Sequence, residues 1–215
     1  RLMSAATGDD STPYSVAAHL EQLLAKNDLA PDAAIGLMEA IIAGRVGPAS
    51  LGALLMALRA KGETAGELAA FAKVMRARAV SVNSPEGTLD TCGTGGDKSR
   101  TFNISTATAL VAAGIGIPIA KHGGRSVSSS TGSADVLKVL GVNIDAPVAC
   151  VERCIKSAGI GFMFAPNHHP GMKHVAPVRR ELGVRTIFNL LGPLSNPAGT
   201  KRQLLGVFEP RLCET

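Results

Sequence analysis

The fold is decided by residues 89–130, which read LDTCGTGGDKSRTFNISTATALVAAGIGIPIAKHGGRSVSSS. Two glycine-rich runs occur in this segment, at 93–97 and at 121–129, and each follows a short apolar stretch with the composition of a buried strand. Strand, helix and strand in this order predict a parallel α/β unit with both glycine-rich loops at the carboxyl edge of its sheet. The expected elements are a strand at 88–92, a helix at 103–114 and a strand at 117–120.

Short apolar runs and helical patterns continue to alternate after this unit, which predicts a larger sheet of mainly parallel strands. The expected elements are helices at 133–140 and 148–157 and strands at 161–164 and 203–208. Before residue 83 the apolar spacing is helical throughout, and Gly44 and Gly62 are expected to end two of the helices. The chain therefore divides into a disordered tail at 1–14, a helical domain at 15–82 and an α/β domain at 83–215. The helical domain carries no distinctive chemistry, which favours a scaffold or a dimer surface.

The composition indicates an enzyme domain and argues against several other classes. With 215 residues, of which 46% are hydrophobic, the chain can bury a substantial core. Aromatic residues make up 3% and Lys and Arg form no basic run, which argues against nucleic-acid binding. No apolar stretch is long enough to span a membrane, and residues 1–13 lack the apolar core of a signal peptide. The net charge of +5 fits an anionic ligand, although a modest excess spread over the surface explains it equally well.

The four cysteines are scattered and contain no Cys-x-x-Cys pair. Cys150 and Cys154 are spaced to share one face of a helix, a spacing that packing usually explains. We therefore expect reduced cytoplasmic thiols without a metal or disulfide role. The cysteines are Cys92, Cys150, Cys154 and Cys213.

The two glycine-rich runs have the chemistry of a phosphate site. In the first run, small residues let backbone N–H groups close around an anion, and the positive end of the following helix favours negative charge. The second run supplies two cations, Lys121 and Arg125, with hydroxyl side chains just behind them. Asn103 and Ser105 suit either a helix cap or a ligand contact. The spacing matches neither the Rossmann fingerprint nor a P-loop, and the residues predict a site for a polyphosphate or a sugar phosphate.

Longer motifs, in order and in register, resemble the anthranilate phosphoribosyltransferases of tryptophan biosynthesis across nearly the whole chain. These motifs are Gly93-Thr94-Gly95-Gly96-Asp97, Thr101-Phe102-Asn103-Ile104-Ser105-Thr106, Lys121-His122-Gly123 with Arg125-Ser126-Val127-Ser128-Ser129, Gly132-Ser133-Ala134-Asp135-Val136-Leu137, Phe164-Ala165-Pro166 with His169-Pro170, Val178-Arg179-Arg180-Glu181-Leu182-Gly183, and Phe188-Asn189-Leu190-Leu191-Gly192-Pro193-Leu194 with Asn196-Pro197. The resemblance implies a cytoplasmic enzyme with the two-domain architecture of nucleoside phosphorylases. It also implies a homodimer formed through the helical domain, and a segment 169–197 that packs against that domain.

The implied reaction joins anthranilate to 5-phosphoribosyl 1-pyrophosphate with Mg²⁺ and releases pyrophosphate. Matching motifs assign the phosphoribosyl pyrophosphate to Gly93, Gly96, Asp97, Thr101, Asn103, Ile104, Ser105, Thr106, Lys121, His122, Gly123, Gly124, Arg125, Ser126, Val127, Ser128, Ser129 and Ser133. Ser105 also contacts Mg²⁺ by the same resemblance. Anthranilate is assigned to Gly93, Gly124 and Arg179, with His122, His169 and Pro193 along its path.

The chemistry gives those assignments physical sense. Departure of pyrophosphate leaves positive charge at the anomeric carbon, so catalysis needs stabilisation of the leaving group and an amine held in line. Lys121 and Arg125 supply the first, and the planar fork of Arg179 suits the carboxylate of anthranilate. An aromatic amine attacks in its neutral form. We therefore assign no general base, and we expect His122 and His169 to shape the pocket.

Two departures from the family pattern bear on this interpretation. The family has Asn after Lys-His-Gly where this chain has Gly124, which removes an amide expected near the acceptor amine. The family's paired acidic residues for Mg²⁺ lie beyond the strand that ends near Phe208, and the only adjacent acidic pair here is Asp9-Asp10. We therefore expect a piece of a longer enzyme. A pyrimidine nucleoside phosphorylase of the same architecture and a non-enzymatic relative that binds nucleic acid are the alternatives.

Overall fold

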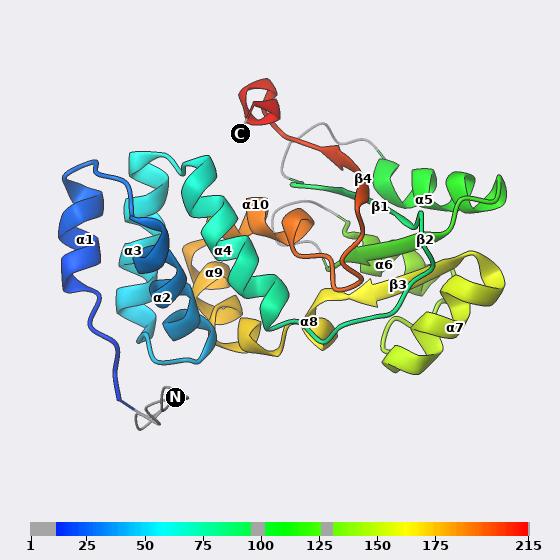
Figure 1. Cartoon of the computed structure of the whole chain (residues 1–215), viewed down its shortest axis with the longest axis horizontal. Helices are drawn as coiled ribbons and strands as arrows, with labels where there is room; N and C mark the ends of the chain where they lie inside the picture. The colour runs from blue at the N-terminus through cyan, green and yellow to red at the C-terminus, as the bar shows by residue number, and fades with distance from the viewer. Residues whose placement is uncertain (1–11, 96–101, 126–130, 215) are drawn as a thin grey trace, which may run out of the picture.

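The N-terminal part of the chain is a bundle of helices (Figure 1). The computed structural model describes residues 12–95, 102–125 and 131–214. Pro31 and Pro48 begin two of the helices, where a missing N–H costs nothing, and Thr64 caps another through a reciprocal pair of hydrogen bonds with Glu67. Gly62 ends the third helix with a φ of +94°. The helices are α1 (Ala17–Leu24), α2 (Pro31–Ile42), α3 (Pro48–Lys61) and α4 (Ala65–Ala77).

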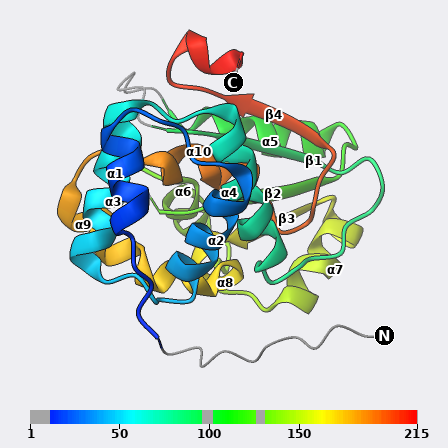
Figure 2. The same cartoon turned by 60° about the vertical axis from the view of Figure 1, so that its left-hand side comes forward.

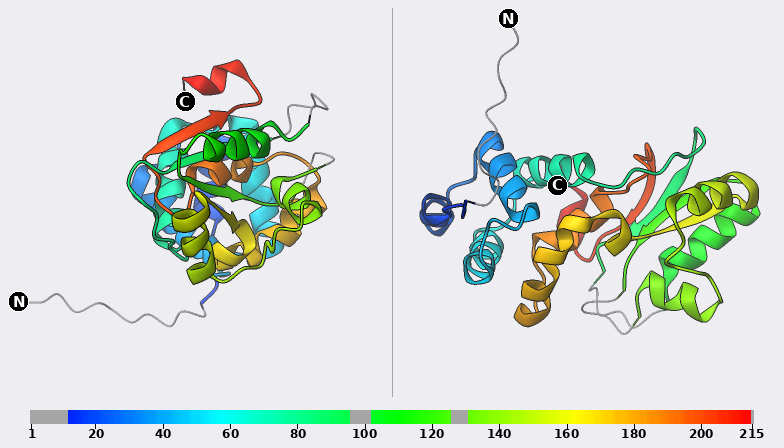
Figure 3. Two further views of the ribbon diagram at one scale, coloured as in Figure 1. Left: turned by 90° about the vertical axis from the view of Figure 1, so that its right-hand side faces the viewer. Right: turned by 90° about the horizontal axis from the view of Figure 1, so that it is seen from below.

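A parallel sheet follows, in the strand order β3-β2-β1-β4, which confirms the expected fold class. Its described strands are β1 (Leu89–Gly93), β2 (Ile119–Gly123), β3 (Ile160–Phe164) and β4 (Arg202–Gly206). Three helices connect the first strands: α5 (Ile104–Gly114), α6 (Ser133–Val139) and α7 (Val148–Ala158). Figure 3 shows all three at the end of the molecule far from the helical bundle. Side chains of α5 and α6 pack on one face of the sheet, whereas Val151 and Ile155 of α7 pack with Ala120 and Met163 on the opposite face. α10 (Ile187–Leu194) contacts β2 on the face that α7 also covers, where the His122 ring lies.

The segment between β3 and β4 returns to the helical bundle (Figure 2). It contains α8 (Ala165–His168), the 3-10 helix η1 (Pro170–His174), α9 (Ala176–Leu182) and α10. Its apolar side chains Val175, Val178, Ile187, Phe188 and Leu191 share one buried cluster with those of α2, α3 and α4. The largest core of the molecule is therefore built from two stretches of chain that are far apart in sequence. A last 3-10 helix, η2 (Pro210–Cys213), follows β4.

The strand order places a switch in connectivity beside β1. The chain runs from β1 outward to β2 and β3, and then crosses back to form β4 on the opposite side of β1. In open parallel sheets, ligands bind in the crevice beyond the carboxyl ends of the strands at such a switch. By this rule the expected crevice lies beyond Gly93 and Gly206, where the first glycine-rich run begins.

The second strand differs from its expected position. The sequence predicted a strand at 117–120 and a loop from residue 121, but β2 spans Ile119–Gly123. Lys121 and His122 therefore lie inside a buried strand, because neighbouring elements supply hydrogen-bond partners for their polar groups. The expected strand at 203–208 likewise lies at Arg202–Gly206.

Candidate functional site

The first glycine-rich loop begins in direct contact with β4. The Thr94 N–H donates to Gly206 O at 2.9 Å, and Thr94 Oγ1 accepts the Phe208 N–H at 3.1 Å. A Cβ added at Gly93 would lie 3.3 Å from Gly206 O, which is closer than ordinary van der Waals contact. Gly95 adopts a φ of +65°, which favours glycine. The loop therefore starts in a fixed position at the crevice between β1 and β4.

The N-terminus of α5 is capped by Asn103. Asn103 Oδ1 accepts the Thr106 N–H at 3.0 Å and the Ser105 hydroxyl at 3.2 Å. The cap orients Ser105, whose Oγ also accepts a hydrogen bond from Lys121 at 3.1 Å. Neighbouring Ile104 is exposed, and Thr106 is buried with no partner for its Oγ1 among the described residues. Asn103 thus serves as a helix cap in this structure.

Lys121 lies beneath the first loop, with 1% of its surface exposed. Its ammonium group donates to Thr91 O and to Ser105 Oγ, so it joins β1 to the first turn of α5. Burial lowers the pKa of Lys121 to about 8, although the nearby Asp90 carboxylate raises it. The side chain is therefore a buried cation at the base of the loop.

The second glycine-rich loop leaves β2 toward α6. Gly124 O accepts the Ala134 N–H at 3.2 Å. Gly123 lies so close to α6 that an added Cβ would be 3.1 Å from Ser133 Cβ. The Arg125 side chain is 57% exposed and its Nη1 lies 4.0 Å from Asp135 Oδ1, so its charge is available at the surface. Gly96, Asp97, Thr101, Ser126, Val127, Ser128 and Ser129, which the sequence also assigned to the ligand, lie outside the described residues.

Two buried histidines face each other between the sheet and α10. The rings of His122 and His169 pack edge to face with their centroids 5.1 Å apart. One ring bonds to the backbone of Gly192 and the other to that of Ser195, both at the end of α10. Burial lowers the pKa of His122 to about 3 and that of His169 to about 4, so both rings are neutral at physiological pH. Their Nε2 atoms have no partner among the described residues.

Arg179 is held on α9 by residues of α10. Its Nη2 donates to Asn189 Oδ1 at 3.4 Å, and its guanidinium carbon lies 5.7 Å from the centre of the Phe188 ring. Burial lowers the pKa of Arg179, which nevertheless stays charged at physiological pH. Its approach to Gly93 and Gly124, which the family resemblance implies, stays a prediction.

The described residues do not by themselves form a Mg²⁺ site. No group of three or more His, Cys, Asp or Glu side chains among them could hold a metal ion. Ser105 supplies one hydroxyl, but that hydroxyl already accepts a hydrogen bond from the Lys121 cation. Mg²⁺ prefers carboxylate and phosphate oxygens, so further ligands would have to come from elsewhere.

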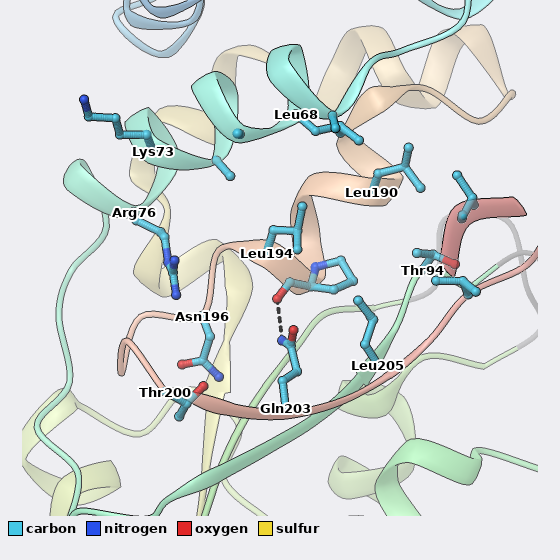
Figure 4. A pocket seen from close by; sticks show the side chains of 16 residues that line it. Leu68, Lys73, Arg76, Thr94, Leu190, Leu194, Asn196, Thr200, Gln203 and Leu205 are labelled. Carbon is cyan, nitrogen blue, oxygen red and sulfur yellow. Dashed lines mark hydrogen bonds between the residues drawn. The ribbon is translucent and has the colours of Figure 1, made fainter. Parts of the chain in front are cut away.

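Sequence reasoning missed Asp90, Gln203 and a hollow beside them. The hollow has a volume of about 590 Å³ and lies between α4, α10 and β4 (Figure 4). Asp90 is fully buried in β1, and Gln203 lines the hollow from β4. A carboxylate in the middle of a segment expected to be a buried strand was the signal that could have identified Asp90. The lining residues are Ala65, Leu68, Ala69, Ala72, Lys73, Arg76, Thr94, Leu190, Pro193, Leu194, Asn196, Thr200, Gln203, Leu205, Val207 and Leu212.

Two family models match the chain, and together they cover most of it. The model described as "Glycosyl transferase family, a/b domain" matches residues 85–215. The model described as "Glycosyl transferase family, helical bundle domain" matches residues 17–79. Within the described ranges, no helix is long and apolar enough to cross a membrane.

Two similar proteins are anthranilate phosphoribosyltransferases. The anthranilate phosphoribosyltransferase of Roseiflexus sp. (strain RS-1) is 56% identical over 193 residues, which cover 90% of this chain and 57% of the relative. The anthranilate phosphoribosyltransferase of Chromobacterium violaceum is 56% identical over 197 residues, which cover 91% of this chain and 58% of the relative. The chain thus spans under three fifths of the length of these relatives.

Solved structures agree in fold. The crystal structure of anthranilate phosphoribosyltransferase from Thermus thermophilus has a TM-score of 0.83 and 48% identity, covering 89% of this chain and 59% of that one. The enzyme from Saccharomyces cerevisiae, in complex with PRPP and Mg, has a TM-score of 0.82 and 30% identity, covering 92% and 59%. Another structure of the yeast enzyme contains 4-fluoroanthranilate.

Proposed function

The chain belongs to the glycosyl transferase family described by the helical-bundle and a/b-domain models, and on this premise we propose that it carries the site of an anthranilate phosphoribosyltransferase. The reaction would transfer the 5-phosphoribosyl group from 5-phosphoribosyl 1-pyrophosphate to anthranilate and release pyrophosphate, as a step of tryptophan biosynthesis. One observation supports the proposal: the Lys121 ammonium group joins Thr91 O of β1 to Ser105 Oγ of α5, beside the start of the Gly93 loop and the expected crevice.

The donor would bind at this crevice. Backbone N–H groups at a helix N-terminus and in a glycine-rich loop favour phosphate oxygens. Lys121 adds positive charge from below, while the exposed Arg125 can approach from the second loop. These groups would stabilise the negative charge that develops on the departing pyrophosphate, which is where the transition state needs it.

Anthranilate would lie on the side of the sheet that faces α10. The neutral rings of His122 and His169 offer a surface that can contact an aromatic ring without adding charge. Arg179 would bind the carboxylate, and Gly124 would border the amine. Because the amine attacks in its neutral form, positioning is the main task of these residues.

We propose Mg²⁺ as part of the site, with ligands that lie outside the described residues in addition to Ser105. The yeast structure with PRPP and Mg supports binding of this ion within the family. Ser105 would contribute one hydroxyl here, and carboxylate ligands would come from outside the described residues. Assembly as a homodimer through the helical bundle and a cytoplasmic location also remain proposals.

Kinetics of the intact protein test the function. Consumption of anthranilate is followed with 5-phosphoribosyl 1-pyrophosphate and Mg²⁺, with each substrate varied separately. Arg179→Gln should raise the KM for anthranilate about ten-fold or more, since it removes the charged partner of the carboxylate. Arg180→Gln, at the exposed neighbouring position on α9, is the matched control and should behave as wild type. Turnover of a pyrimidine nucleoside with phosphate, without turnover of anthranilate, would instead support the phosphorylase alternative.

A further inference from the structure

Asp90 is a buried carboxylate to which the proposed reaction assigns no task. It lies in β1 with 0% of its surface exposed. A carboxylate in the interior of a sheet is costly unless hydrogen bonds satisfy it. Both oxygens are satisfied: Oδ1 accepts the His122 N–H at 3.2 Å, and Oδ2 accepts from Gln203 Nε2 at 3.1 Å.

The first of these bonds fixes the backbone of His122. The pairing of β1 with β2 is in register at Leu89 and Ile119. Further along β2, the His122 N–H donates to the Asp90 side chain. The carboxylate therefore sets where the His122 main chain lies, and with it the ring that packs against His169.

The second bond reaches α10 through Gln203. Gln203 Nε2 also lies 2.6 Å from Pro193 O, and Figure 4 shows this hydrogen bond across the hollow. The Pro193 carbonyl is open to a side chain because α10 ends at Leu194 and residue 197, four positions on, is a proline without an N–H. The two N–H groups of one amide thus tie Pro193 to Asp90.

We propose that Asp90 is a positioning residue that holds His122 and Pro193, two walls of the acceptor pocket, at a fixed separation. The inference rests on the proposed function, because both residues are walls only if anthranilate binds there. Asp90 reaches three elements at once: β2 directly, β4 through Gln203, and α10 through Gln203 and Pro193. It is buried beneath the pocket, so it acts through its neighbours.

The neighbouring cation does not explain the carboxylate. Lys121 interacts with Asp90 electrostatically, but its ammonium group donates to Thr91 O and Ser105 Oγ on the donor side of the site. The direct hydrogen bonds of Asp90 go to the acceptor side instead. Loss of the Asp90 carboxylate should therefore affect anthranilate more than the phosphoribosyl donor.

The test uses Asp90→Asn and Gln203→Met in the intact protein. The side-chain oxygen of an asparagine at position 90 can still accept the His122 N–H. Its amide nitrogen then faces Gln203 Nε2, and two N–H donors cannot bond to each other. Gln203 must then turn its oxygen toward residue 90, and Pro193 O loses its donor. Gln203→Met removes the same bond while keeping the side-chain volume. Each variant should raise the KM for anthranilate roughly five- to ten-fold and change the KM for the donor less than about two-fold.

The double variant gives the decisive readout. Because both substitutions break one connection, Asp90→Asn combined with Gln203→Met should be no worse than the more impaired single variant. Thr88→Val is the control: Thr88 is buried just before the same strand and its hydroxyl donates to Pro85 O, away from both walls. It should lower the melting temperature without changing either KM. Melting curves of every variant separate loss of fold from loss of positioning.

The outcomes distinguish the two proposals. An intact wild-type protein that does not use anthranilate would overturn the proposed function and this inference with it. An active wild type whose variants show equal changes in both KM values, or multiplicative effects in the double variant, would overturn the positioning role alone. Gln203→Met keeps the test decisive even if Asp90→Asn does not fold.

Discussion

At Gly124 the backbone leaves room for the amide that the family pattern contains. Its φ lies outside the left-handed region, and an added Cβ would be 3.9 Å from Ala165 Cβ, an ordinary contact. Gly124 is therefore not required for a positive φ. Gly124→Asn should raise kcat/KM for anthranilate about two- to ten-fold, the worth of one neutral hydrogen bond.

Gly124→Ala is the matched control, because it adds the Cβ without the amide. It should leave kcat/KM for anthranilate near the wild-type value. Steady-state kinetics with each substrate varied separately provides the measurement. Equal effects of Ala and Asn would mean that the acceptor amine does not approach residue 124.

The buried histidines should make stability depend on pH. In the unfolded chain a histidine titrates near pH 6.5, whereas burial lowers the pKa of His122 to about 3 and that of His169 to about 4. The unfolded state therefore binds more protons as the pH falls below 6.5, and stability is lost toward the folded pKa values. From about pH 7.5 to pH 5, each histidine should lower the free energy of unfolding by about 2 kcal/mol.

Denaturant unfolding at the two pH values measures this loss. His122→Gln, which cannot titrate in this range, should reduce it. An identical pH dependence in wild type and His122→Gln would show that the ring is not buried in its neutral form.

At the scale of elements, α7 packs on β3 through a glycine. A Cβ at Gly161 would lie 2.8 Å from Val151 O and 2.5 Å from Ile155 Cγ1, so the helix would have to move. Gly161→Ala should destabilise the protein by about 1–3 kcal/mol. Gly114→Ala, at the end of α5 with open space around it, should stabilise by about 0.5–1 kcal/mol. The melting temperature should fall for Gly161→Ala and rise for Gly114→Ala. If it rises for both variants, α7 does not pack tightly on Gly161.

Periodicity was enough to predict most elements, because apolar spacing reports directly which residues must be buried. It failed at β2, where the polar residues Lys121 and His122 read as a loop. Their burial depends on partners from β1, α5 and α10 that are distant in sequence. Asp90 and Gln203 were missed for the same reason. Asp90 bonds to His122, 32 positions away in sequence, and to Gln203, 113 positions away. Glycine-rich loops, by contrast, carry their chemistry locally, and the sequence located the start of the first loop, at the end of β1.

At the scale of the whole molecule, η1 joins the returning segment to the bundle at Gly171. A Cβ there would lie 2.2 Å from Ile42 Cγ2 and 2.9 Å from Ile42 O, at the end of α2. Gly171→Ala should lower the free energy of unfolding by about 1–3 kcal/mol. Gly66→Ala in α4 has ordinary clearance and serves as the control that should not destabilise. If denaturant titrations place both variants at the wild-type midpoint, η1 does not pack tightly against α2.

The shared core has a consequence for how this protein can be divided. The family model for the helical bundle ends at residue 79, yet the bundle's core also contains Val175, Ile187 and Leu191. Two separate fragments divided between residues 79 and 85 would therefore each contain only part of the bundle's hydrophobic core. A chimera that exchanges the helical bundle between relatives should therefore exchange α9 and α10 together with α1–α4. In this chain the segment that matches the helical-bundle family model and the segments that form the bundle's core have different boundaries.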